Sequence, residues 1–136
     1  MAGTVTITRV PLRAPDDGKK IEKITIAWTG DAADGTVPNT VVSGLYGWCV
    51  KVLTNPGSTA PTANYDIAFL DPDDSGLDAF ATLLNNRHTT TSEQVYPLIS
   101  GAATPIFLAG DYTFNLTNNA VNSATGTCTL YMVESL

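Results

Sequence analysis

The run of residues 54–64 is the feature that most constrains this fold, because it is a loop-forming stretch set between two apolar segments. It reads Thr-Asn-Pro-Gly-Ser-Thr-Ala-Pro-Thr-Ala-Asn, and residues 50–53 and 65–70 flank it. Pro56 and Pro61 fix the backbone φ angle, and the Thr and Asn side chains can bond to nearby backbone groups. Such a run predicts short strands joined by stiff polar loops.

The composition favours a β-protein of one domain. The chain has 136 residues, of which 43% are hydrophobic and only 15% are charged. Thr accounts for roughly one residue in seven, and this β-branched residue suits half-buried strands. A chain of this length is large enough to bury a core of its own.

Hydrophobic alternation of period two predicts about eight strands. Turn signals recur every ten residues or so, which favours an all-β, two-sheet β-sandwich of the jelly-roll type. We expect residues 1–20 to be an N-terminal strand or arm with a connector, and residues 21–136 to be the sandwich domain. The eight predicted strands cover residues 4–10, 22–28, 45–54, 64–71, 93–99, 104–108, 111–115 and 125–133, and residues 39–43 are a possible further short strand.

One segment departs from the strand pattern. Leu77, Phe80, Ala81 and Leu84 recur at the spacing of an amphipathic helix. The sequence therefore predicts one short helix near residues 76–86.

The net charge of −6 is unevenly distributed. Residues 1–23 hold five cations against three acids, whereas residues 24–136 hold two cations against ten acids. An acidic body argues against nucleic-acid binding, which depends on neutralising phosphates. A basic N-terminal arm that reaches an acidic surface of a neighbouring subunit is one interpretation, and a solvated terminus with chance charges is the other. The arm carries Arg9, Arg13, Lys19 and Lys20.

The sequence predicts a protein made in a reducing cytoplasm. We expect no secretory leader, because residues 1–4 run directly into an alternating segment, and no apolar run approaches the ~20 residues that span a bilayer. Cys49 and Cys128 each lie in an apolar segment and are expected to be buried as small apolar side chains. A disulfide between them is the alternative.

No catalytic residue, cofactor site or metal site is predicted. The stretch that begins at Asp71 resembles a calcium loop, but the twelfth position, which needs a bidentate acid, is Thr82. A strand-to-helix turn is the favoured interpretation, with a calcium site of another type as the alternative. His88 is the only histidine, so one chain offers no multi-histidine site.

The aromatic residues are expected mainly in the core, because nearly all of them fall in strand-like alternations. The alternative is a carbohydrate-binding platform of exposed rings. We expect a non-enzymatic protein in either case.

Three stretches are similar to small virion proteins of tailed bacteriophages. They are residues 52–71, which include the loop; Ser-Glu-Gln-Val-Tyr-Pro at 92–97; and Gly-Thr-Cys-Thr-Leu-Tyr-Met-Val at 126–133. The resemblance implies a structural component of a phage particle, located in the virion. A capsid decoration (cement) protein is the favoured hypothesis. A neck, tail or fibre-base protein is the alternative, and a carbohydrate- or receptor-binding module is a third.

The partners that this resemblance implies are the major capsid protein or other virion proteins. A homo-trimer or another symmetric homo-oligomer is expected, since binding several subunits at once increases avidity. The residues predicted to contact partners are Arg9, Arg13, Lys19, Lys20, Asn55 and Pro56.

Overall fold

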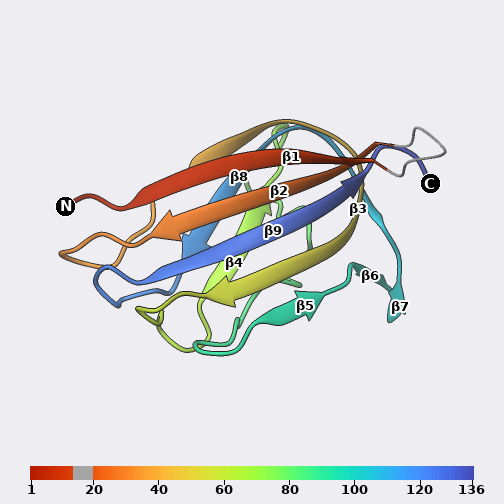
Figure 1. Cartoon of the computed structure of the whole chain (residues 1–136). Helices are drawn as coiled ribbons and strands as arrows, with labels where there is room; N and C mark the ends of the chain where they lie inside the picture. The colour runs from red at the N-terminus through yellow and green to blue at the C-terminus, as the bar shows by residue number, and fades with distance from the viewer. Residues whose placement is uncertain (14–19) are drawn as a thin grey trace.

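The computed structural model describes residues 1–13 and 20–136, and the described chain is all-β (Figure 1). Seven antiparallel strands form one open sheet in the order β1-β2-β9-β3-β8-β4, with β5 also paired to β3. β6 and β7 form a separate two-stranded ribbon. The bounds are β1 Thr4–Arg13, β2 Lys20–Thr29, β3 Thr40–Pro56, β4 Asp66–Leu70, β5 Glu93–Val95, β6 Leu98–Ile99, β7 Ala102–Ala103, β8 Ile106–Thr117 and β9 Thr125–Val133.

Strand β3 is the pivot of this sheet. Its first part, from Thr40 to Cys49, pairs with β8, and the part from Trp48 onwards pairs with β9. The register shifts once in each pairing, which marks bulges that bend the strand. At Gly47 the φ angle is +126°, and a Cβ atom there would lie 2.5 Å from the carbonyl oxygen of Val133. Only glycine permits this close approach.

The bend curls the sheet so that its two ends share one core. β1, β2 and β9 lie in front of β4 and β8 in Figure 1. Trp28 of β2 and Tyr65, just before β4, have ring centroids 5.7 Å apart although three strands separate β2 from β4 in the sheet order. The buried cluster includes Ile24 and Ile26 from one end and Ile67 and Phe69 from the other.

The all-β class is therefore confirmed, whereas a jelly roll of two separate sheets is not. β3 bonds to strands of both layers and joins them into one sheet. The same strand unites two predicted strands, 39–43 and 45–54, and β8 unites the predicted 104–108 and 111–115. The expected end of the first strand at Pro11 is also corrected, since β1 continues to Arg13.

The prediction of a helix near residues 76–86 is wrong. Asp78 forms a β-bridge with Leu70, and residues 79–84 form successive turns. Ala81 and Thr82 have φ angles of +50° and +66°, outside the right-handed helical region. The segment bonds to the margin of β4 instead: the N–H of Ile67 donates to the carbonyl of Leu84 (3.1 Å), and the N–H of Ala79 donates to that of Phe69 (2.8 Å).

The apolar residues have a helical spacing because Phe80 and Leu84, four positions apart, are both buried in the core. Asp78 holds the turns in place: its carboxylate accepts the backbone N–H groups of Phe69, Phe80 and Thr82 at 3.0–3.1 Å. Leu77, which the helical pattern placed on the apolar face, is 58% exposed.

Candidate partner-binding surfaces

Arg9 is placed on β1, where its side chain bonds within the molecule. Its guanidinium pairs with the carboxylate of Glu22 on β2 and donates to the carbonyl oxygens of Ser43 and Gly44 at the bulge of β3. These bonds link the margin strand β1 to the layer behind it. Arg9 thus links two parts of the curled sheet, and we call these contacts the Arg9 latch.

Of the other predicted cations, Lys20 lies near Arg9, and the rest are outside the described structure. Lys20 begins β2 and is exposed. Together with Arg9, Glu22 and Glu134 it lines a cavity of about 400 Å³ whose inner wall is apolar. Lys19 and the side chain of Arg13 lie outside the described residues.

Asn55 and Pro56 end β3 and pair with the start of β9, whereas Lys20 lies near the end of β9. The side chain of Asn55 accepts a hydrogen bond from the hydroxyl of Ser92 (2.9 Å), and Pro56 lies opposite Gly126 of β9. Asn55 borders a shallow groove of about 330 Å³ lined mainly by Thr side chains of β1, β2 and β9. The structure therefore does not bring Arg9 and Lys20 together with Asn55 and Pro56.

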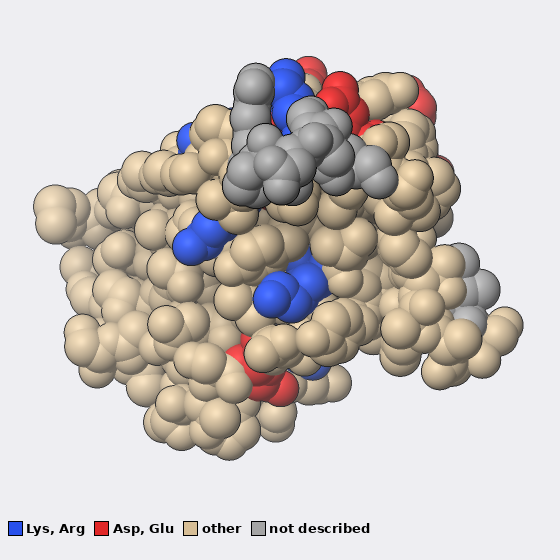
Figure 2. Space-filling view, turned by 45° about the vertical axis from the view of Figure 1, so that its right-hand side comes forward, with Lys and Arg blue, Asp and Glu red and all other residues tan. Residues whose placement is uncertain are grey.

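Charged side chains are sparse on the face that Figure 2 shows. The blue Lys and Arg side chains are separated by uncharged, tan surface, so this face carries no continuous basic patch among the described residues. The charge imbalance seen in the sequence is therefore not gathered into one basic surface on this face.

The loop that follows β3 is fixed by hydrogen bonds at both ends. The N–H of Gly57 donates to the carbonyl of Thr125 (2.7 Å), and the N–H of Asn64 donates to that of Arg87 (3.2 Å). Asn119 joins this loop to two others: its amide oxygen accepts the N–H of Thr62 (3.0 Å), and its amide nitrogen donates to the carbonyl of Gly35 (2.7 Å). This end of the molecule is a preformed surface.

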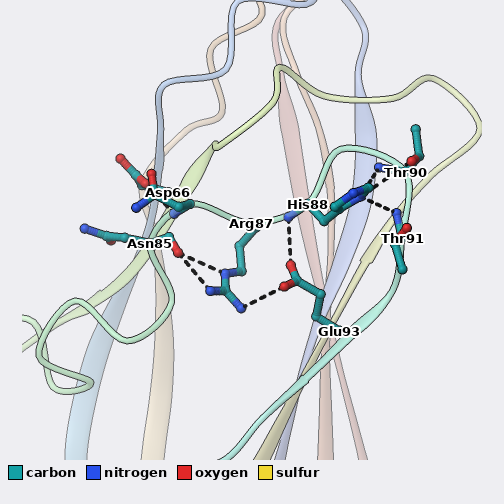
Figure 3. A network of polar contacts seen from close by, with 8 residues as sticks. Asp66, Asn85, Arg87, His88, Thr90, Thr91 and Glu93 are labelled. Carbon is teal, nitrogen blue, oxygen red and sulfur yellow. Dashed lines mark hydrogen bonds and ion pairs between the residues drawn. The ribbon is translucent and has the colours of Figure 1, made fainter.

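A network of polar contacts fixes the neighbouring segment 85–93 (Figure 3). The guanidinium of Arg87 donates to the carbonyl of Asn85 (2.8 Å) and lies 3.6 Å from the carboxylate of Glu93, which accepts the N–H of His88 (2.7 Å). The ring Nδ1 of His88 accepts the N–H of Thr91 (2.9 Å). The single histidine therefore has a structural role in its own loop.

Three aromatic side chains form an exposed group, although the alternation of the sequence predicts most aromatic residues in the core. Tyr46 and Trp48 of β3 both contact Phe107 of β8, with ring centroids 5.6 and 5.2 Å from that of Phe107. Tyr46 is 66% exposed, Phe107 is 45% exposed and Trp48 is half-buried. We call these three residues the aromatic surface.

A signal for the aromatic surface was present in the sequence. β3 carries apolar side chains on both faces, which is typical of a strand buried on both sides. Between residues 45 and 49 only one face of β3 is buried, the face that carries Leu45 and Cys49. The other face presents Tyr46 and Trp48 to solvent. Next to it, the ammonium group of Lys51 lies 4.5 Å from the ring centroid of Tyr131, a cation–π contact.

The two cysteines are free and buried. Burial raises the pKa of Cys49 to about 12, and burial together with the nearby Cys49 raises the pKa of Cys128. Burial, followed by the charges of Cys128 and Glu93, raises the pKa of Tyr65 to about 12. Since a thiolate is the reactive form, these thiols are not suited to nucleophilic chemistry.

Within the described ranges, no three His, Cys, Asp or Glu side chains are grouped as metal ligands. Asp71 instead accepts the N–H of Asp73 (2.8 Å) in a turn. The same ranges contain no helix long and apolar enough to cross a membrane. No protein-family model, curated protein or solved structure matches the chain.

Proposed function

We propose that this protein is a non-enzymatic structural component of a bacteriophage particle, a capsid decoration (cement) protein that binds the outer capsid surface and stabilises the shell. The class comes from the resemblance of residues 52–71, 92–97 and 126–133 to small virion proteins. A protein of this kind is made in the host cytoplasm and ends in the virion. Its partner is the major capsid protein.

The observation that carries a binding role is the aromatic surface. Tyr and Trp are enriched where proteins bind one another, and exposed apolar groups rimmed by polar residues mark such sites. Tyr46, Trp48 and Phe107 stand on two paired strands, so their positions are fixed before a partner arrives. A rigid apolar anchor of this kind loses little conformational entropy on binding.

The curled sheet suits this role, because its two layers form a scaffold that presents surfaces at its faces and ends. The fixed loop at 57–64 offers a second, polar contact at the end of the sheet. A neck, tail or fibre-base position uses the same surfaces with another partner.

The test is to locate the protein on the particle. Purified protein is mixed with capsids that lack it, and the bound sites are located in a reconstruction of the particle. We expect density at regular positions on the outer shell, and Trp48→Ala or Phe107→Ala should reduce binding at least tenfold, as loss of an interface hot spot does. Density confined to the neck or tail would instead support the alternative position.

Leu77→Ala is the matched control, because Leu77 is also an exposed apolar side chain but lies on the segment that covers β4. It should bind capsids as the wild type does. Equal losses for Leu77→Ala and Trp48→Ala would contradict a specific role for the aromatic surface.

The same three rings favour a second candidate function, a carbohydrate- or receptor-binding module. Exposed aromatic side chains on a sheet face are what that function requires, and Tyr46 and Trp48 also carry polar groups at their ring edges. A glycan array distinguishes it: binding that is lost in Trp48→Ala supports this candidate, and no binding by the wild type rejects it.

A further inference from the structure

The outer side of β1 is a row of backbone groups that faces away from the sheet. The N–H of Glu134 donates to the carbonyl of Lys20 (3.1 Å), so Lys20 and every second residue of β2 direct their backbone groups toward β9. The residues between them, such as Ile21 and Lys23, therefore face β1, where they lie opposite Leu12 and Val10.

Even-numbered residues of β1 thus bond to β2, and Val5, Ile7 and Arg9 direct their N–H and C=O groups outward. Pro11 supports this phase, because proline has no N–H and is accepted in a strand where its nitrogen faces away from the neighbour. Within the described residues, no backbone hydrogen bond joins this outer side to another segment.

Between Thr4 and Val10 the edge has one of the usual protections, the charged side chain of Arg9, which turns inward to Ser43 and Gly44. The other protections are missing there. All ten residues of β1 pair one to one with β2 without a register shift, so no bulge turns the edge away. No Lys or Pro lies between Thr4 and Val10. A long, regular edge of this kind is a template for pairing with another strand.

We propose that β1 pairs with β1 of a second copy of this chain, antiparallel about a twofold axis at Ile7, to form one sheet that is continuous across a dimer. This dimer would form in solution whatever the function of the protein.

The choice of a second copy rests on the symmetry of the edge. Pro11 and Gly3 are each four residues from Ile7, so a twofold at Ile7 places the residue without an N–H opposite the residue just before the strand. Val5 then lies opposite Arg9 of the second copy and Ile7 opposite Ile7. The outward groups of these three residues form three hydrogen-bonded pairs across the axis. Each such pair of an antiparallel ladder exchanges two bonds, so about six hydrogen bonds result.

The side chains agree with this register. Thr6 lies opposite Thr8 of the second copy, and Thr–Thr pairs stabilise antiparallel strands. Arg9 lies opposite Val5, so the two Arg9 side chains are kept apart and like charges do not face each other. A shift by two residues would place Pro11 opposite Val5 in two symmetry-related pairs, and each pair would lack the N–H that proline does not have.

The test uses charge on the exposed face of β1. Thr6 and Thr8 are both exposed, so Thr6→Lys with Thr8→Lys should leave the monomer folded but place like charges opposite each other in the dimer. Thr6→Glu with Thr8→Glu should act in the same way. The wild type should have twice the monomer mass by light scattering, and each double variant should have the monomer mass.

Mixing the two double variants should restore the dimer, because each introduced lysine then lies opposite an introduced glutamate. Native mass spectrometry should show a mixed dimer with one chain of each kind. The control is Thr91→Lys with Gln94→Lys, which adds the same charge at exposed positions in and next to β5, away from β1, and should remain dimeric.

Three results would overturn the proposal. They are a wild type that is monomeric across the concentration range, a lysine variant that remains dimeric, and folded double variants that form no mixed dimer. Circular dichroism of each variant establishes that it is folded, so that loss of the dimer reports on the edge of β1 and not on unfolding.

Discussion

The two edge strands of the sheet, β1 and β4, form its two margins, and they differ in how their outer backbone groups are bonded. At the β4 margin, residues 77–87 run alongside the strand and bond to its backbone, and the carboxylate of Asp78 accepts the N–H of Phe69 in the middle of it. At the β1 margin, the backbone is regular and its outer side bonds to no described segment. The side chain of Arg9 donates from it to carbonyl oxygens in the layer behind.

This difference separates a margin that completes the core from one that is available for contacts. Ile67 and Phe69 of β4 are fully buried, whereas Val5 and Ile7 of β1 are only partly buried. An open strand edge is normally protected against pairing. In β1 the described backbone leaves this edge open, whereas at the other end of the sheet order residues 77–87 bond along β4.

The largest expected effect is on the free energy of unfolding, because side chains of β4 are more deeply packed in the core than those of β1. Phe69→Ala should lower the free energy of unfolding by about 3–5 kcal/mol, because it removes a buried ring that packs on Phe80 and Phe114. Ile7→Ala should cost about 1–2 kcal/mol, since Ile7 is only partly buried. Urea denaturation measures both values. Equal losses would show that β1 is as much a part of the core as β4.

A smaller effect is expected when the cover of β4 is loosened. Asp78→Ala should cost about 2–3 kcal/mol, because it leaves three backbone N–H groups without their charged acceptor. Asp73→Ala, an exposed acid on the same connection, is the control and should change stability by less than about 0.5 kcal/mol. Hydrogen exchange should also become faster at Phe69. Unchanged exchange there would mean that the turns cover β4 without Asp78.

Alkaline pH should weaken the core that the two margins share. Cys49 and Tyr65 have pKa values raised to about 12 in the folded protein, above their ordinary values. The unfolded chain therefore releases protons first as the pH rises above about 9, and stability falls between about pH 9 and 12.

The measurement is the Tm as a function of pH. The Tm should be nearly constant from pH 7 to 8 and then decline, and Cys49→Ala should make the decline less steep. A Tm that is constant up to pH 11 would contradict the burial of these groups.

The smallest effect is expected from removing divalent cations. EDTA should leave the Tm unchanged, because Asp71 accepts backbone N–H groups in a turn and the loop lacks its closing acid. Differential scanning calorimetry with and without the chelator measures this. A clear fall in Tm would show that the connection at the β4 margin holds a cation.

The sequence was most informative where local pattern and tertiary environment agree. The alternation of residues 125–133 predicts β9 with the bounds that it has in the structure. The spacing of Leu77, Phe80 and Leu84 predicted a helix, but this pattern reports only which side chains are buried. Backbone partners from β4 decide the conformation, and no local pattern contains them.

The aromatic surface shows the same limit for the candidate site. Alternation places Tyr46 and Trp48 on one face of a strand, but it does not say whether another layer covers that face. The Arg9 latch depends on a bulge at Ser43 and Gly44, thirty-four and thirty-five positions along the chain, which the charge pattern does not show. Which residues meet was therefore harder to predict than which residues form strands.

The position of β9 has a consequence for how the chain acquires its structure. β9 lies between β2 and β3 and bonds to both, although it follows them by about a hundred and by about seventy residues. During synthesis the β1–β2 hairpin and most of β3 leave the ribosome with no partner between them. The cooperative folding step must wait until residues 125–133 have been made, and closing such long loops makes that step slow.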